Sequence, residues 1–270
     1  MNILNNTYHE IIMLMSIGLF ISTAEYLVKI KIFATDGLLS WNVMQIRWEN
    51  SSKNWLAQTA FKFINPRGLS AIFVLRCILL LALAFAPVGS LNAWLCLTGL
   101  LITVLLSSLV TFYGSDGSDQ MTLLIIVTLF LVFCPIGHAN PTLLKIGIWF
   151  VGLQSCLSYA VAGLAKLFSN EWRRGTAIKD VFNTRTYGSP WALSLLNNRP
   201  WLNKFLCWNV ILMETLFPLS LFLPFPLAVC FWIWGFTFHF LTAVIMGLNS
   251  FLWAFMATYP AIYFIHTQLA

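Results

Sequence analysis

The sequence predicts an all-α, polytopic integral membrane protein, a helical bundle with about eight transmembrane helices. Of its 270 residues, 59% are hydrophobic and only 9% are charged, whereas soluble domains usually carry about 25% charged residues. Apolar stretches long enough to cross a bilayer recur along the whole chain. Backbone hydrogen bonds must be closed internally in lipid, and the alternation typical of β-barrel strands is absent, so we expect helices.

The predicted spans are the stretches that approach 20 mostly apolar residues. They cover residues 11–28, 70–87, 91–112, 121–137, 143–165, 205–223, 227–247 and 250–266, and the last is short. No Lys or Arg precedes the first stretch, so we do not expect a cleaved signal peptide. We expect residues 1–270 to form a single transmembrane domain.

Two long loops, 29–69 and 166–204, separate the spans and carry most of the basic residues. We expect short amphipathic helices in both loops, with Trp41, Trp48 and Trp55 at the membrane interface in the first. Eight spans would place both loops on one side of the membrane. The positive-inside rule predicts that this side is cytoplasmic and that the N-terminus is outside.

Composition also excludes several classes of function. The net charge is +6, but no helix face is basic enough to follow a phosphate backbone, so no nucleic-acid partner is expected. The six cysteines lie within apolar stretches without any CxxC spacing, and the four histidines are scattered. We therefore expect buried, unpaired cysteines and no metal site.

Charged residues inside spans are costly and usually face a partner or water. Glu214 lies mid-span in "WNVILMETLFPLSLF", four residues before Pro218, and this proline frees a backbone carbonyl where a polar pocket can form. Lys166 lies at the end of another span. Glu214 is either in a structural salt bridge with Lys166, or a neutral, hydrogen-bonded carboxyl, or part of a site in which it sets the protonation of a lysine base. For Lys166, reaching the interface from the span end is a sufficient alternative explanation.

Three further polar residues lie within spans. His239 either joins the pocket of Glu214 or is a core histidine with a satisfied hydrogen bond. Arg76 and Lys145 lie near the predicted span ends, so we expect their side chains to reach the interface as simple anchors.

Two charged segments border the predicted spans. Before the fourth span, Ser118 or Asp119 is expected to cap the helix, and Asp116, Asp119 and Gln120 are candidates for a polar mouth that binds substrate. Behind Lys166, Trp172 is expected to fix the depth of the segment 171–175 at the membrane interface. Arg173 and Arg174 are candidates to bind phosphate or the carboxylates of a peptide. Anchoring to lipid headgroups explains the presence of these two arginines equally well.

The segment "YAVAGLAKL" (159–167), followed by "EWRRGTAI" (171–178), resembles the part of vitamin K-dependent γ-glutamyl carboxylase in which a helix ending in a lysine precedes an acid, a Trp and a Gly. That enzyme belongs to the broader family of horizontally transferred transmembrane (HTTM) proteins. Further blocks similar to this family follow in the same order: "TDGLLSW" (35–41), "GSDGSDQM" (114–121), "METLFPLSLF" (213–222) and "HFLTAVIMGLNSF" (239–251). The chain looks most like the bacterial branch whose named member matures a sporulation-delaying peptide toxin.

The resemblance implies a chemistry and a set of site residues. In the carboxylase, a lysine deprotonates vitamin K hydroquinone, the oxygenated quinone removes a γ-proton from a peptide glutamate, and the carbanion captures CO2. That lysine falls on Lys166, and Glu214 and His239 would support it. The candidate substrate-binding residues, taken from the polar segments of this sequence, are Asp116, Asp119, Gln120, Trp172, Arg173, Arg174 and Asn249.

The resemblance also implies a cofactor, partners and a location. The cofactor would be a reduced quinone, either menaquinol or vitamin K hydroquinone. The partners would be the lipid bilayer, a secreted peptide substrate and a small accessory protein. The chain would lie in the bacterial cytoplasmic membrane.

The sequence departs from the carboxylase pattern in three respects. Residues 116–121 lack the histidine that assists the enzyme, and the large non-membrane domain of the carboxylase has no counterpart within residues 1–270. The family topology also places both long loops on the outer face, opposite to the charge bias. Two other functions therefore stay open: a non-catalytic membrane factor for maturation or export of a secreted peptide toxin, and a small-molecule transporter, although the broken helices and paired halves of transporters are not evident.

Overall fold

The computed structural model confirms the all-α prediction, since every regular element that it describes is a helix. It describes residues 2–34, 36–37, 39–44, 64–111, 116–135 and 140–269. The chain divides into two compact units, Met1–Gly147 and Ile148–Ala270.

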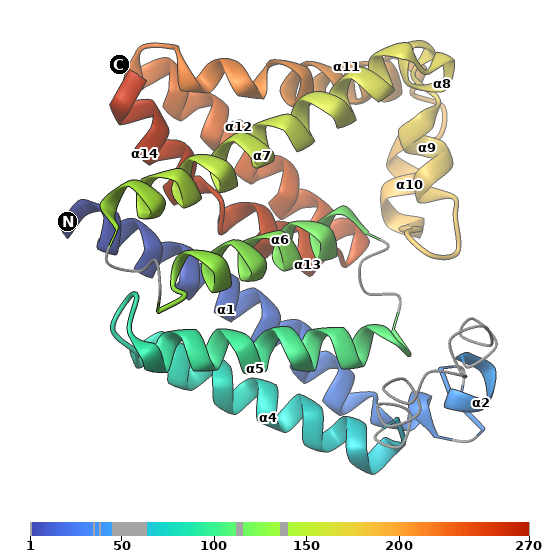
Figure 1. Cartoon of the computed structure of the whole chain (residues 1–270). Helices are drawn as coiled ribbons and strands as arrows, with labels where there is room; N and C mark the ends of the chain where they lie inside the picture. Colours follow the sequence, from blue (N-terminus) through green and yellow to red (C-terminus); the bar gives the residue numbers. More distant parts are fainter. Residues whose placement is uncertain are drawn as a thin grey trace. The chain divides into compact units, whose positions relative to one another are not determined.

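The first unit is built around three long helices. Its elements are α1 (Asn2–Val28), η1 (Ile30–Phe33), α2 (Trp41–Met44), α4 (Pro66–Phe85), α5 (Leu91–Ser108) and α6 (Gly117–Val132). Helix α4 packs against both α1 and α5, and Figure 1 shows α4 and α5 side by side. The Asn65 side chain caps α4 by accepting a 2.9 Å hydrogen bond from the Gly68 N–H, and Pro66 follows at the first helical position, where its missing N–H costs nothing.

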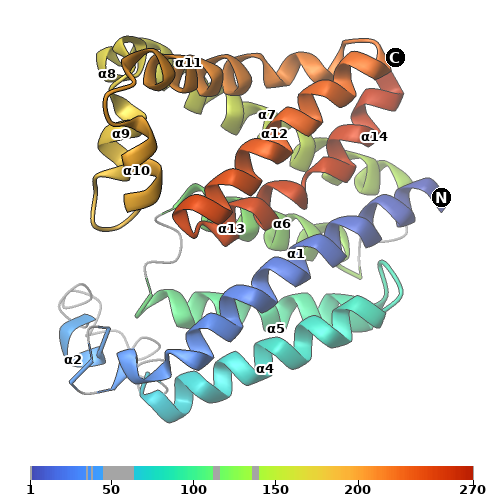
Figure 2. The ribbon, with the colours of Figure 1, turned by 180° about the vertical axis from the view of Figure 1, so that it is seen from behind.

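The second unit holds the candidate site. Its elements are α7 (Pro141–Phe168), which begins in the first unit, α8 (Asn170–Arg174), α9 (Ala177–Phe182), α10 (Pro190–Leu196), α11 (Pro200–Leu216), η3 (Phe217–Leu221), α12 (Phe225–Met246), α13 (Asn249–Met256) and α14 (Tyr259–Leu269). Helices α8, α9 and α10 lie at one end of α11. Figures 1 and 2 both show α9 and α10 running across the direction of α11.

Six of the described helical segments are long and apolar enough to cross a membrane: α1, α4, α5, α7, α11 together with η3, and α12. These six segments indicate a multi-pass membrane protein. Helix α6 is apolar but has only 16 residues. The stretch predicted as the last span is two helices, because the chain turns at Ala257 and Thr258 and Pro260 cannot donate a backbone hydrogen bond.

The expected cap of α6 is wrong. The helix begins at Gly117, so Asp116 occupies the N-cap position, and Ser118 and Asp119 lie in the first turn. In the first long loop, α2 is a single turn that starts at Trp41. Trp48, Trp55 and the amphipathic segment expected around Trp55 lie outside the described residues.

The expectation for Arg76 is also wrong. Helix α4 begins at Pro66, four residues before the predicted start of the span, so Arg76 lies mid-helix and only 1% of it is exposed. Its Nη2 atom donates 2.6 Å hydrogen bonds to the Thr103 carbonyl and to Ser107 Oγ on α5. The guanidinium therefore ties α4 to α5 inside the first unit and does not reach the membrane interface.

Candidate functional site

One face of α7 carries three polar side chains that contact residues later in the chain. Ser155, Tyr159 and Lys166 are spaced by four and seven residues, which puts them on the same side of a helix. Each contacts a side chain of a later element: the hydroxyl oxygens of Ser155 and Thr258, for example, are 2.8 Å apart. This face therefore organises the polar interior of the unit.

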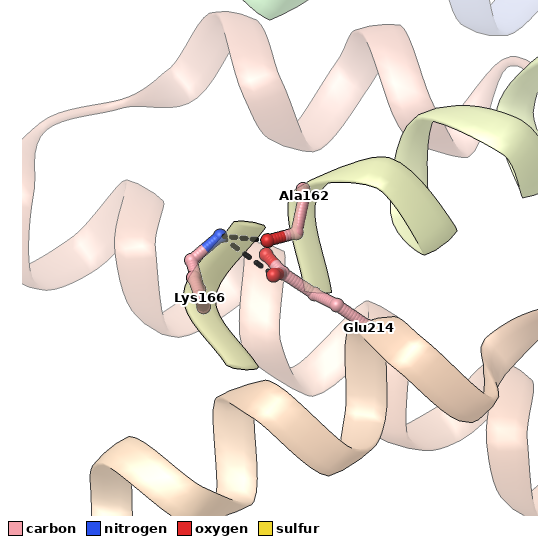
Figure 3. A network of polar contacts seen from close by, with 3 residues as sticks. All are labelled: Ala162, Lys166 and Glu214. Carbon is pink, nitrogen blue, oxygen red and sulfur yellow. Dashed lines mark hydrogen bonds and ion pairs between the residues drawn. The ribbon is translucent and has the colours of Figure 1, made fainter. Parts of the chain in front are cut away.

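The charged member of this face is an ion pair between Lys166 and Glu214. Lys166 Nζ donates a 2.6 Å hydrogen bond to Glu214 Oε2, and it lies 3.5 Å from the Ala162 carbonyl oxygen, as Figure 3 shows. The two side chains differ in exposure, at 22% for lysine and 7% for glutamate. The carboxylate is thus enclosed, whereas the amine is reachable from outside the unit.

A glycine lets α7 and α11 approach closely enough for this pair to form. A Cβ atom on Gly163 would overlap the Thr215 backbone nitrogen and lie 2.8 Å from the Glu214 carbonyl carbon. Only a residue without a side chain fits there. Beyond the pair, α11 ends at Leu216 and continues as the 3₁₀ helix η3, and Pro218 has no N–H to donate to the Glu214 carbonyl four residues earlier.

Helix α8 covers the ion pair with an aromatic ring. Lys166 Nζ lies 5.3 Å from the centre of the Trp172 ring, within the range of a cation–π interaction. Ser169 Oγ caps α8 by accepting a 3.4 Å hydrogen bond from the Trp172 N–H, and it donates a 2.7 Å bond to Glu171 Oε2. The bond from Ser169 lowers the pKa of the exposed Glu171 carboxyl below its usual value.

The rest of α8 is fastened to α11. Arg173 Nη2 donates a 2.7 Å hydrogen bond to Asn170 Oδ1, and its carbonyl accepts a 3.2 Å bond from Trp208 Nε1. The helix ends at Gly175 in the left-handed conformation, where a Cβ atom would lie 2.5 Å from Lys204 Cα. Arg174 is exposed.

His239 forms a second buried polar contact, and its partner is Tyr159. The Tyr159 hydroxyl and His239 Nε2 are 2.7 Å apart, and both residues are buried. The histidine ring stacks on Phe255 and the tyrosine ring on Phe217, with centroid distances of 4.6 Å and 4.0 Å. Sequence reasoning missed Tyr159, because a single tyrosine in an apolar span usually serves packing.

The buried polar atoms near these contacts that have no hydrogen-bond partner within the described part of the chain include His239 Nδ1 and Thr215 Oγ1. Buried polar atoms are nearly always bonded, so each calls for an explanation. Thr215 follows Glu214 directly, and its hydroxyl lies against Gly163 where α7 and α11 meet.

The structure places the other predicted site residues as follows. Asp116, Asp119 and Gln120 belong to the first unit, at the start of α6, where Gln120 is exposed and the two acids are half-buried. Asn249 is exposed and is the first residue of α13 in the second unit. Of the predicted residues, the structure therefore brings Lys166 together with both Glu214 and Trp172.

Among the described residues, no group of three or more His, Cys, Asp or Glu side chains could hold a metal ion. No family model, no curated protein and no solved structure matches the chain. The site is therefore interpreted from its own geometry.

Proposed function

We propose that this chain is a membrane enzyme related to vitamin K-dependent γ-glutamyl carboxylase, which modifies a secreted peptide with the help of a reduced quinone. The Lys166–Glu214 pair would be its proton-transfer site. The observation that carries the proposal is the 2.6 Å contact between an enclosed carboxylate and an amine that is 22% exposed. Charged groups at membrane depth are costly and are most often functional.

The pair can supply a base without leaving an unbalanced charge. In the ion-paired state, Lys166 holds a proton and Glu214 is negative. Passing that proton across the 2.6 Å contact would turn both groups neutral and leave a free amine beside a protonated carboxyl. The free amine of Lys166 can then accept a proton from an acidic substrate hydroxyl, and the resulting ammonium neutralises the substrate anion.

The residues around Lys166 fit a flat ring that carries hydroxyl groups. The Trp172 ring provides an aromatic surface beside the amine. A bound quinol would supply the acidic hydroxyl and the reducing electrons. Lys166 would hold its proton, and Glu214 would fix the position of Lys166.

The proposal includes a topology with eight crossings in a bacterial cytoplasmic membrane. Helix α6 would supply one crossing in addition to the six long segments, and α13 and α14 together would supply the last. A secreted peptide and a small accessory protein would be the partners.

The test is reconstitution of wild type and Lys166→Ala in proteoliposomes with reduced menaquinone or vitamin K, oxygen, labelled CO2 and a glutamate-rich peptide. We expect quinone epoxide and labelled peptide from wild type, and neither from a mutant whose thermal unfolding shows that it is folded. Equal epoxide formation by the folded mutant would contradict the role of Lys166.

A second function is a non-catalytic membrane factor for maturation or export of the peptide. One support is that the Lys166–Glu214 pair can serve as a structural salt bridge without any role in catalysis. The other is that residues 116–121 lack the histidine that assists the carboxylase. The same experiment separates the two functions. Absence of epoxide from both proteins, with loss of peptide maturation in cells only in proportion to a lower abundance of Lys166→Ala, would favour this factor.

A further inference from the structure

The segment that we call the collar, residues 169–205, combines exposed aromatic side chains with basic side chains that are exposed except for the half-buried Lys179. Its basic residues are Arg173, Arg174, Lys179, Arg185, Arg199 and Lys204, and its acidic residues are Glu171 and Asp180. Within the described part of the chain, none of these six basic side chains forms an ion pair. Six basic and two acidic residues give the collar a net charge of +4.

Large apolar side chains of the collar form two exposed pairs at helical spacing. On α10, Ala192 and Leu196 are buried against the unit, whereas Trp191, which is 64% exposed, and Leu195 face away. At the start of α11, Trp201 and Phe205 form a similar exposed pair, and Trp201 is 69% exposed. Two apolar pairs thus lie in the same short segment as the basic residues.

The position of the collar in the chain determines what it meets. It joins α7 to the segment Pro200–Leu221, and both have the length and composition to cross a membrane. The chain therefore leaves and re-enters one face of the bilayer here. Helices α9 and α10 run across the direction of α11, so they extend along the membrane surface if α11 crosses it (Figures 1 and 2).

The collar is also folded firmly enough to act as a platform. The Asn203 side chain donates hydrogen bonds of 3.0 Å and 3.3 Å to the carbonyls of Leu196 and Arg199, which fixes the turn between α10 and α11. The close approach of Gly175 to Lys204 holds α8 against α11.

We propose that the collar is a binding surface for anionic lipid headgroups. Trp191, Leu195, Trp201 and Phe205 insert at the level of the headgroups, and the basic side chains contact lipid phosphates. Exposed apolar side chains beside basic ones are typical of surfaces that lie in a charged membrane interface. An acidic peptide would need the positive charge but not the outward tryptophans. This inference does not depend on the proposed enzymatic function.

The test is quenching of tryptophan fluorescence by brominated lipids in bilayers that contain the full-length protein. The contribution of Trp191 and Trp201 is obtained by comparing wild type with Trp191→Phe/Trp201→Phe. We expect brominated phosphatidylglycerol to quench this contribution at least several-fold more efficiently than brominated phosphatidylcholine at low salt. We expect this excess to fall toward equality at high salt, because salt screens exposed charges.

Charge variants complete the test. Arg173→Gln/Arg174→Gln/Arg185→Gln should lose the preference for phosphatidylglycerol, whereas Arg67→Gln, which removes an exposed arginine from the first turn of α4, should keep it. If the triple variant does not fold, the effect of salt on the preferential quenching of wild type by brominated phosphatidylglycerol still tests the proposal. Equal quenching by the two lipids, or no quenching of these tryptophans by either, would overturn the proposal. In the second case, binding of a glutamate-rich peptide to the collar becomes the alternative.

Discussion

At the scale of single residues, Lys166 has two possible roles, to provide a positive charge and to act as a base, and a substitution can distinguish them. Lys166→Arg keeps a cation opposite Glu214, but a guanidinium does not give up its proton in proteins. We expect this variant to fold and to lose quinol oxidation by about 100-fold or more, the usual range for loss of a general base. The measurement is turnover in proteoliposomes, normalised to folded protein. Activity within tenfold of wild type would show that Lys166 supplies only charge.

The contact between Tyr159 and His239 makes a separate prediction about stability. Tyr159→Phe keeps the ring stacked on Phe217 but leaves His239 Nε2 buried without a partner. We expect the free energy of unfolding to fall by about 1–3 kcal/mol. The matched control is Tyr187→Phe, which removes an exposed hydroxyl and should change stability by less than about 0.5 kcal/mol. Similar losses in both variants would contradict the buried bond.

At the scale of elements, the central feature is the close approach of α7 to α11 at Gly163. Gly163→Ala places a methyl group against the backbone of Thr215, which cannot move without shifting α11. We expect a loss of about 1–3 kcal/mol and a weakened Lys166–Glu214 contact. Gly99→Ala on α5 is the control, since its nearest neighbour would be the flexible Leu79 Cδ1 atom at 2.8 Å.

Thermal unfolding of these two glycine variants in detergent is the measurement. The control should be nearly neutral, because alanine favours a helix over glycine by about 0.5–1 kcal/mol and the Leu79 side chain can turn aside. A Gly163→Ala protein as stable as Gly99→Ala would mean that α7 and α11 do not lie this close.

Part of the fold and of the candidate site could be predicted from the sequence. The long apolar segments and the pairing of Lys166 with Glu214 follow from composition and from the cost of isolated charges in lipid. Arg76 was misjudged because the Asn65 cap starts α4 before the apolar run begins, which moves the arginine to mid-helix. The contact of Tyr159 with His239 joins residues 80 positions apart, and no local pattern reports such a contact.

At the scale of the whole molecule, the number of crossings can be tested by the parity of two sites. If α6 crosses the membrane, α4, α5, α6 and α7 give four crossings between residues 36 and 183, so both sites face the same side. If α6 does not cross, they face opposite sides. We expect cysteines introduced at the exposed positions Asp36 and Asn183, in a background without the six native cysteines, to react with a membrane-impermeant reagent from one side. Reaction from opposite sides would exclude the eight-crossing topology.

The ion pair itself can be tested by a double-mutant cycle of Lys166→Met and Glu214→Leu, with thermal unfolding of the full-length protein as the measurement. Each single variant leaves a charge without its partner, and we expect Lys166→Met to cost more, about 3 kcal/mol, because the remaining carboxylate is the more deeply buried group. The double variant removes both charges, so it should be more stable than Lys166→Met by roughly 2 kcal/mol. Losses that simply add in the double variant would contradict a direct Lys166–Glu214 pair, and with it the proposed proton-transfer site.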